Sequence, residues 1–336
     1  MASRSSSAPF LLTLIIAPLL AFVLHICVGK YPLNPALIPS LFVEGLYGIS
    51  KHNPEQLVLF NIRLPRAVMA VLFGATMGIT GASLQSILKN PLVSPYTLGI
   101  SSGAAVGAAL SLAFNLEVFS TEALAFTFAL LAVFLTLTIS RFRGGLSPVT
   151  IVLAGMIVTA LFHGVLTLVQ IIAQPENVSA IVGWIAGRLN AVTWNHVLLS
   201  VPLAFVGVLG ILLLRWRVFV LSMGDEEARA LGMDVVKERL VVIVLVSLAV
   251  SSVVTAVGVI GWVCLIAPHL TRLMIGSDPK KLLPASLSLG ATFLLIADAL
   301  AKSVWVYEIP VGVVATLVGA PLFLYLLRRS MHAYGV

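Results

Sequence analysis

Apolar runs of about 20 residues recur along the whole chain, and they restrict its fold more than any other feature. A helical run of this length spans a bilayer, whereas the strands of a membrane barrel alternate over about 10 residues. Only 10% of the residues are charged and 60% are hydrophobic, far from the composition of soluble domains. The sequence therefore predicts an all-α polytopic membrane protein, one transmembrane domain over residues 1–336 with ten spanning helices. The predicted helices are 8–28, 65–87, 96–114, 122–140, 148–172, 194–214, 240–257, 260–275, 284–302 and 310–328.

Basic residues lie mainly at the ends of the apolar runs, where they act as topology signals. Ten spans put both termini on one side, and the first run is expected to stay as a helix because no small-x-small cleavage site follows it. With a cytoplasmic N-terminus, 14 of the 20 Lys and Arg face the cytoplasm, as the positive-inside rule requires. The net charge of +7 is thus explained without nucleic acid. The six external residues are Lys30, Lys51, Arg63, Arg66, Arg188 and Lys302.

The segment Leu221 to Gly232, LSMGDEEARALG, is polar between two apolar blocks. Ser222 with Asp225 three residues later resembles a capping box, and Gly232 suits the position after a helix end, so we predict a helix of about two turns. Asp225 and Arg229, four residues apart, are expected to form an ion pair. The local chemistry leaves two interpretations open, a solvated loop and a docking helix for a soluble partner. The charge count puts the segment in the cytoplasm.

Two arginines enclose a proline in Arg63-Leu64-Pro65-Arg66, at the external end of the second span. Proline suits the first turn of a helix. The arginines could anchor the helix to lipid headgroups or form a docking patch for an acidic external partner. Asp298 lies within the ninth span and should face protein or a cavity, and Lys302 one turn later could pair with it or reach the surface.

The connection between the second and third spans, residues 85–95, contains Asn90, Pro91 and Pro95. These residues should break the helix at membrane depth, which is tolerated where protein or a water-filled cavity covers the backbone. Glycines in both flanking spans favour close helix packing. This combination favours a transport protein over a passive anchor.

The external stretch from 174 to 193 predicts a short interfacial helix with Trp184 as a belt residue. His269 is interpreted as a packing residue, because no second His or carboxylate lies at metal-ligand spacing. Cys27 and Cys264 lie far apart in apolar runs, which favours packing over a disulfide.

Enzymatic motifs are absent from the sequence. It contains no G-x-x-x-x-G-K-[ST] phosphate loop, no H-E-x-x-H and no G-x-S-x-G. A secondary transporter or channel usually has several ionisable residues within its spans, and here only Asp298 qualifies clearly. An ATP-driven importer instead requires a cytoplasmic helix for a separate ATPase and an external surface for a delivery protein, and both are predicted.

With these features together, the sequence resembles the FecCD family, the permease subunits of importers for ferric siderophores, haem and vitamin B12. The resemblance covers nearly the whole chain. It rests on RLPR at 63–66, GASLQSILKNPLVSPYTLGISSGA at 81–104, LAG at 153–155, LSMGDEEARALGMD at 221–234, GVIGWVCLIAPHLTRLMIGSD at 258–278, LLIADALAK at 294–302 and EIPVGVVATLVGAPLF at 308–323.

The resemblance implies a homodimer, or a pair with a paralogous permease, in the cytoplasmic (inner) membrane lipid. ATP and Mg would bind the partner ATPase subunits, with no cofactor on this chain, and a periplasmic or lipoprotein substrate-binding protein would dock outside. The implied docking residues are Arg63, Arg66 and Lys302, the last standing where Arg is typical. The implied gate or path residues are Ser147, Pro148, Val149, Thr150, Trp184 and Arg188. The implied coupling helix covers Gly224, Asp225, Glu226, Glu227, Ala228, Arg229, Ala230, Leu231 and Gly232.

The cargo stays open at this stage. The family carries iron chelates, haem and corrinoids, and some relatives carry small oxyanions such as molybdate. Arg188 could contact an anionic ligand or anchor the protein at the interface. An ion-coupled secondary transporter is the alternative class.

Overall fold

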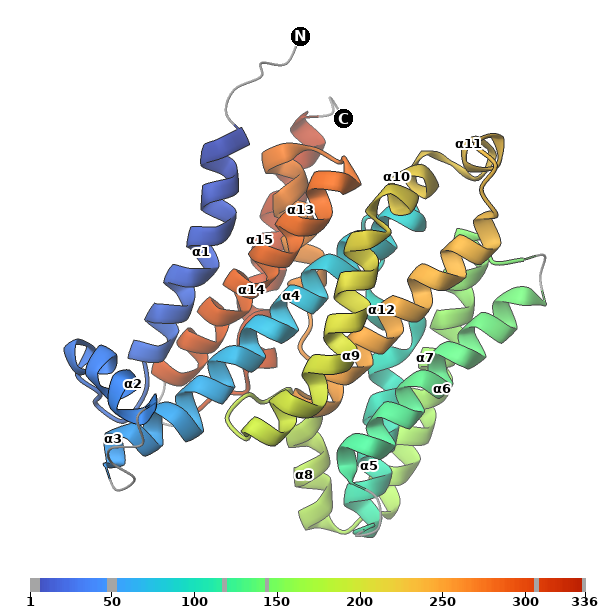
Figure 1. Cartoon of the computed structure of the whole chain (residues 1–336). Coiled ribbons are helices and arrows are strands. Elements are labelled where there is room, and N and C mark those ends of the chain that lie inside the picture. Colours follow the sequence, from blue (N-terminus) through green and yellow to red (C-terminus); the bar gives the residue numbers. More distant parts are fainter. Residues whose placement is uncertain (1–6, 47–52, 117–119, 143–144, 305–307, 334–336) are drawn as a thin grey trace.

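The computed structural model describes residues 7–46, 53–116, 120–142, 145–304 and 308–333 (Figure 1). Within these ranges every regular element is helical, and ten helices follow the ten predicted spans in order, which confirms the predicted fold class. Their bounds are α1 Ser7–Cys27, α4 Leu64–Ile87, α5 Ile100–Phe114, α6 Thr121–Arg141, α7 Pro148–Ile172, α9 Trp194–Leu213, α12 Val235–Val257, α13 Val263–Ile275, α14 Pro279–Ser303 and α15 Val311–Ala333.

Six of the described helices are long and apolar enough to cross a membrane by themselves. They are α6, α7, α9, α12, α14 and the continuous helical stretch Pro54–Ile87 that includes α4. The helices α5 and α13 are shorter, with 15 and 13 residues, whereas α1 and α15 have 21 and 23. These four helices complete the predicted set of ten.

Two helices begin earlier than the hydropathy pattern predicts. The α12 helix starts at Val235 rather than at residue 240, and α14 starts at Pro279 rather than at 284. Each has an aspartate at its N-cap: Asp234 accepts a hydrogen bond from the backbone N of Lys237 at 3.1 Å, and Asp278 accepts one from Lys280 at 3.0 Å. A capped first turn carrying charged residues is stable outside the apolar layer, where hydropathy gives no signal.

Short helices fill the connections. The external segment before α4 contains η1 Pro35–Leu37, α2 Ile38–Leu46, α3 Pro54–Leu57 and the π-helical η2 Val58–Arg63, so its described part is largely helical. The predicted interfacial helix is present as α8, Pro175–Ile185. The predicted break after α4 is also present: the chain turns after Ile87 and passes through η3, Pro95–Leu98, before α5.

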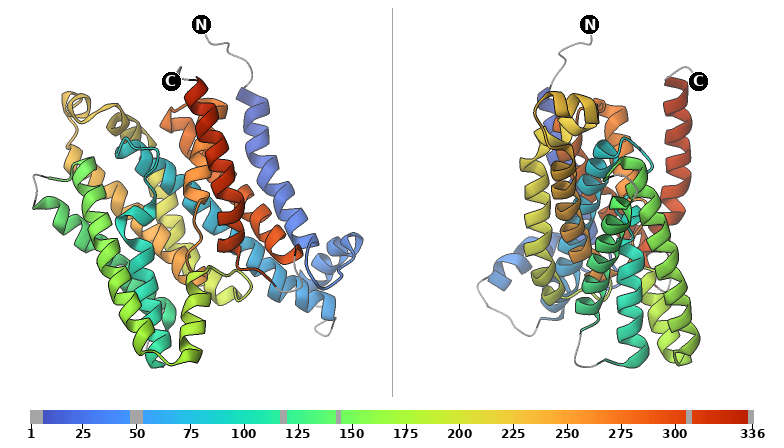
Figure 2. Two further views of the ribbon diagram at one scale, coloured as in Figure 1. Left: turned by 180° about the vertical axis from the view of Figure 1, so that it is seen from behind. Right: turned by 90° about the vertical axis from the view of Figure 1, so that its right-hand side faces the viewer.

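The helices α4 and α14 run side by side through the middle of the molecule (Figures 1 and 2). Their backbones touch at Gly74 and Gly290, where a Cβ atom on either residue would collide with the carbonyl oxygen of the other. Glycine at both positions allows this approach, which supplies packing where lipid gives helices no hydrophobic reason to associate.

Two groups of helices flank this pair. The helices α5, α6 and α7 pack together on one side, and α1 and α13 pack against α14 on the other (Figure 1). Figure 2 shows α7 and α15 on the face opposite to α9. Both helices carry exposed leucines, including Leu153, Leu161 and Leu317.

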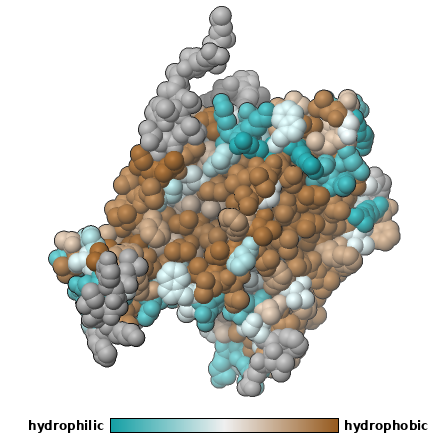
Figure 3. All heavy atoms as spheres, viewed as in Figure 1, coloured by the Kyte–Doolittle hydropathy of each residue, from teal (hydrophilic) through white to brown (hydrophobic). Residues whose placement is uncertain are grey.

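The two ends of the molecule differ in polarity from the region between them. The start of α1, the end of α15 and the short helix α11, Asp225–Ala230, lie at the same end (Figure 1), as an even number of spans requires. A broad apolar belt separates this end from the opposite one (Figure 3). We call the end with α11 the cytoplasmic side, following the charge distribution, and the other end the external side.

Candidate functional site

The polar segment predicted as one helix is divided by Gly224. The helix α10, Arg215–Met223, continues through Ser222, and α11 starts only at Asp225. Ser222 is therefore not a helix cap, which corrects the capping-box interpretation, because its Oγ donates to the carbonyl of Phe219 at 2.6 Å instead. Gly232 does follow the helix end with a φ of 78°, the left-handed conformation that glycine adopts at no steric cost.

The two faces of α11 differ sharply. Ala228 is fully buried, whereas Glu226, Glu227, Arg229 and Ala230 are exposed. Leu231, directly after the helix, is 65% exposed. The exposed face of α11 thus consists of charged side chains with one large apolar side chain, Leu231, beside them.

Asp225 pairs with Arg239 of α12 rather than with Arg229, which corrects the predicted ion pair. Nη2 of Arg239 lies 2.6 Å from Oδ1 of Asp225, and Nη1 of the same guanidinium donates to the carbonyl oxygen of Leu146 at 2.6 Å. Arg239 is 1% exposed. This arginine thereby links α11 to the turn before α7. Sequence reasoning missed it because neither contact is local.

The predicted gate residues form that turn and the first turn of α7. Oγ of Ser147 caps α7 by accepting from the backbone N of Thr150 at 3.2 Å, and Pro148 occupies the first turn. A cavity of about 370 Å³ lies against Pro148 and Val149. It is lined by Leu88, Lys89, Asn90 and Pro91 on one rim and by Pro148, Val149, Val152 and Leu153 on the other.

The other rim belongs to the broken connection after α4. Nζ of Lys89 donates to the carbonyl oxygen of Met223 at 3.0 Å, at the junction of α10 and α11. Gln85, at the end of α4, donates to the carbonyl oxygen of Cys264 at 3.1 Å and accepts from Arg272 at 2.6 Å. Protein therefore holds both flanks of the break, whereas Lys89, Pro91 and Leu92 within it are exposed.

The three basic residues expected to dock a binding protein are buried in this conformation. Arg63 donates to the carbonyl oxygens of Ile26 at 2.6 Å, Cys27 at 3.0 Å and Tyr31. Nζ of Lys302 donates to the carbonyl oxygen of His25 at 2.7 Å. Both side chains hold the end of α1 against α4 and α14, and their docking role stays a prediction.

Asp298 faces protein, as its place in the ninth span predicted, and it is the centre of a buried charge network. It is fully buried and accepts from Nε and Nη2 of Arg66, at 2.8 and 3.0 Å, and pairs with Nε2 of His25 at 2.7 Å. Arg66 also binds Glu308 at 2.9 Å. The network gives the carboxylate and the guanidinium partners, which burial in an apolar layer requires. Sequence reasoning did not find His25 and Glu308, because no local pattern relates them to Arg66.

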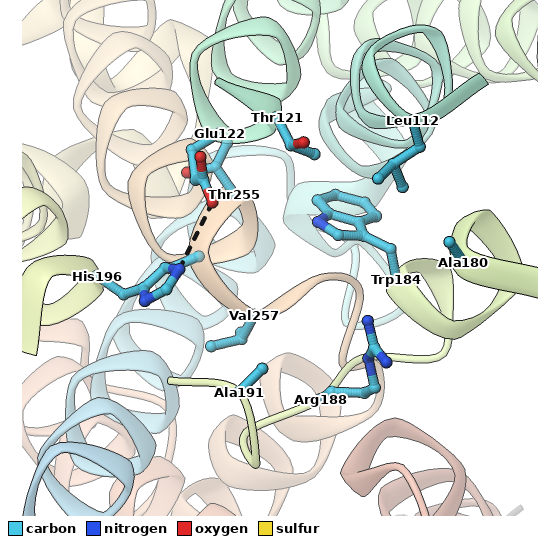
Figure 4. Close-up of a pocket in the computed structure, with 11 residues that line it drawn as sticks. Leu112, Thr121, Glu122, Ala180, Trp184, Arg188, Ala191, His196, Thr255 and Val257 are labelled. Carbon is cyan, nitrogen blue, oxygen red and sulfur yellow. Dashed lines mark ion pairs between the residues drawn. The ribbon is translucent and has the colours of Figure 1, made fainter. Parts of the chain in front are cut away.

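Trp184 and Arg188 meet at an external cavity of about 200 Å³ between α6, α8, α9 and α12 (Figure 4). Trp184 is half-buried there rather than placed in a lipid-facing belt, and the Arg188 side chain is exposed. Glu122 and His196 pair at 3.5 Å across the cavity (Figure 4). Sequence reasoning missed this pair, since it forms only when α6 and α9 come together.

Comparison with known proteins agrees with this arrangement. Residues 14–329 match the FecCD transport family. The chain belongs to this family. It is 38% identical over 286 residues to the probable iron chelatin transport system permease protein of Helicobacter pylori, covering 83% of this chain and 86% of the relative. It is 34% identical over 315 residues to the molybdate import system permease protein of Haemophilus influenzae, covering 92% and 93%.

A solved structure extends the match to three dimensions. A chain described as an inward-facing conformation of a metal-chelate type ABC transporter superposes with a TM-score of 0.85 at 31% identity, covering 96% of this chain and 99% of the other. This FecCD-family protein is thus a multi-pass permease subunit of an ABC importer, and the ATPase is a separate subunit.

Proposed function

We propose that this FecCD-family permease moves a metal chelate, namely a ferric siderophore, haem or a corrinoid, across the cytoplasmic membrane. The observation that carries the proposal is the match over 96% of the chain to a metal-chelate type ABC transporter. The relative at 38% identity is described as a permease for an iron chelatin. Molybdate is a second candidate cargo, supported by the molybdate permease at 34% identity.

The helix α11 would dock in a groove of the ATPase. Its exposed face combines Glu226, Glu227 and Arg229 with the adjoining Leu231, and it stands beyond the apolar belt (Figures 1 and 3). An apolar anchor within a charged rim suits a protein contact. Nucleotide and Mg would bind on the ATPase, and this chain would need no cofactor.

A substrate-binding protein would dock on the external side, near the ends of α1, α4 and α14. Arg63, Arg66 and Lys302 are occupied by internal partners. Direct contacts from these residues to acidic groups of a binding protein would therefore require part of the network to open. The electrostatic attraction between the partners is expected to weaken with salt.

A second copy of this chain, or a paralogous permease, would cover the face formed by α7, α8 and α15. That face exposes Met156, Leu161 and Leu317 and contains two shallow apolar hollows on either side of Tyr96. The translocation path would run between the two copies along this face.

The test is uptake by the reconstituted importer. The permease, its ATPase and its binding protein are placed in liposomes with internal ATP, and a ferric siderophore, haem, cobalamin and molybdate are offered in turn. We expect ATP-dependent accumulation of one of the metal chelates. Accumulation of molybdate alone would select the second candidate. Uptake without ATP, driven by an ion gradient, would overturn the assignment in favour of a secondary transporter.

A further inference from the structure

We propose that Arg239 is a positioning residue that joins α11 to the start of α7, so that a displacement of α11 moves the rim of the cytoplasmic cavity. The inference rests on the proposed docking of α11 to the ATPase. It adds a specific route by which the docked helix acts on the permease, from Asp225 through Arg239 to Leu146.

The geometry of this link is a fork with two acceptors. Nη2 of Arg239 contacts the Asp225 carboxylate and Nη1 contacts the carbonyl oxygen of Leu146, both at 2.6 Å. Leu146 is buried and directly precedes Ser147, the N-cap of α7. Because the second acceptor is a backbone atom, the arginine holds the turn itself rather than a mobile side chain.

Burial makes this link hard to break. Arg239 is the largest of the fully buried side chains in the described part of the chain, and Asp225 is 30% exposed. Charge-assisted hydrogen bonds strengthen away from water, and removing one partner of a buried cation leaves an uncompensated charge. Helix α11 packs against α10 and α12 and buries only Ala228. Arg239 is therefore its strongest polar connection to the body of the permease within the described residues.

The link ends at a cavity whose two rims both connect to the α10–α11 segment. The rim at Val149 follows the turn held by Arg239, and the rim at Lys89 is joined to the carbonyl of Met223 at 3.0 Å. The lysine contact is exposed and therefore weaker. When α11 moves relative to α10, the rim at Val149 therefore moves farther than the rim at Lys89. The distance between the two rims of the cavity of about 370 Å³ changes as a result.

The variant Arg239→Lys tests the fork while keeping the positive charge. A lysine carries a single compact ammonium group and does not reproduce the planar fork. In the reconstituted importer we expect the number of substrate molecules taken up per ATP hydrolysed to fall roughly tenfold, which corresponds to about 1.4 kcal/mol. Co-purification with the ATPase and the rate of ATP hydrolysis should stay close to those of the unaltered importer.

Two further variants separate coupling from folding. Asp225→Asn removes the charge that Arg239 contacts and leaves the Leu146 contact in place, so it should also lower the number of substrate molecules taken up per ATP hydrolysed. The double variant Asp225→Asn with Arg239→Lys should lower this ratio no further than Arg239→Lys alone. Arg217→Gln is the control, because it removes an exposed ion pair of 2.7 Å between Arg217 and Glu238, again between α10 and α12 but away from the turn. It should leave the ratio unchanged. An unchanged ratio in Arg239→Lys, or additive losses in the double variant, would overturn the inference.

A distance measurement tests the link from α11 through Arg239 to the α7 turn without any ATPase. Spin labels on exposed Glu226 of α11 and exposed Val149 of the α7 turn report their separation in the permease alone. We expect one narrow distance distribution in the otherwise unaltered chain and a broad one with Arg239→Lys. Distance distributions of equal width in the two proteins would refute the link, even if the importer is ATP-driven. A broadened distribution together with a complete lack of ATPase binding would support the link and reject the proposed function.

Discussion

Asp298 and Arg66 are 232 residues apart in sequence, and inside the membrane domain they form a two-point contact of 2.8 and 3.0 Å. One carboxylate oxygen also contacts Nε2 of His25. The external ends of α1, α4 and α14 are therefore held by charge and hydrogen bonding, in addition to the glycine contacts in the middle of α4 and α14.

Removing the acid at the centre of this network should be costly. Asp298→Ala leaves the guanidinium of Arg66 buried with only Glu308 as an acidic neighbour among its described contacts, and we expect a loss of about 3–5 kcal/mol in unfolding free energy. Glu308→Gln is the matched control, because Glu308 is 25% exposed and its loss should cost about 1 kcal/mol or less. Thermal unfolding of the purified permease in detergent measures both. Similar losses for the two variants would contradict a central role for Asp298.

Charge reversal should affect folding strongly at the buried Arg63 and weakly at the exposed Arg188. Arg63→Glu places a carboxylate against three backbone carbonyl oxygens, so we expect little folded protein in the membrane. Arg188→Glu should change the unfolding free energy by about 0.5 kcal/mol or less, as for other exposed positions. Quantifying folded permease by fluorescence-detected size exclusion compares the two. Normal yield of Arg63→Glu would mean that its burial is not required for folding.

A docking role for the external basic residues has its own measurement. Neutralising Lys302 to Gln keeps the length of the side chain approximately and removes the charge. If Lys302 contributes to docking, the affinity for the binding protein should fall at low salt and the difference should shrink at high salt. Isothermal titration at two ionic strengths measures this, with thermal unfolding as a check on folding. An affinity that is unchanged at low salt would exclude Lys302 from the docking surface.

Exchanging two charges on α11 should uncouple the importer without unfolding the permease. Glu227 and Arg229 are both exposed, so the double variant Glu227→Arg with Arg229→Glu should insert and unfold normally. Its ATP-driven uptake should fall because the charge pattern facing the ATPase is reversed. Uptake assays with the reconstituted complex measure the expected fall in uptake, and thermal unfolding checks that the variant is folded normally. Full uptake by the double variant would rule out a contribution of these two charges.

The contact between α4 and α14 predicts a strong effect of one methyl group. Gly290→Ala places a Cβ against the carbonyl of Gly74, and overpacking of this kind costs about 1–3 kcal/mol. Gly164→Ala in α7 is the control, because a Cβ atom added at Gly164 meets no described atom within 4 Å. Comparing the unfolding temperatures of the two variants tests the contact. An equal temperature for both would show that the helices can separate without cost.

Hydropathy predicted the ten helices, because the bilayer imposes length and polarity on each span independently of the others. Helix ends outside the apolar layer were predicted less well. The starts of α12 and α14 depend on the caps Asp234 and Asp278, which have no effect on hydropathy. The division at Gly224 was missed for a related reason. The helix α10 contains polar residues, so hydropathy did not predict it as a helix that ends before Gly224.

The site was predictable only where residues act locally. The end of α11 at Gly232 follows from a local signal, whereas the capping-box pattern at Ser222 placed the start of the helix too early. The pairing of Asp225 with Arg239 competes with the local alternative Arg229, and only the packing of α11 on α12 decides it. The same holds for the external arginines Arg63 and Arg66, whose acceptors are carbonyl groups and acids on other elements and therefore leave no trace in the local sequence.

The contact between His25 and Asp298 has a consequence for biogenesis. The two residues are 273 positions apart, so at about 5–20 residues per second the ribosome needs roughly 15–55 s to supply the partner of His25. During this interval α1 resides in the bilayer with a polar group near its external end and without α14. Arrival of α14 then supplies the acid that both α1 and α4 require. The last third of the chain thereby completes the placement of the first helix to be inserted.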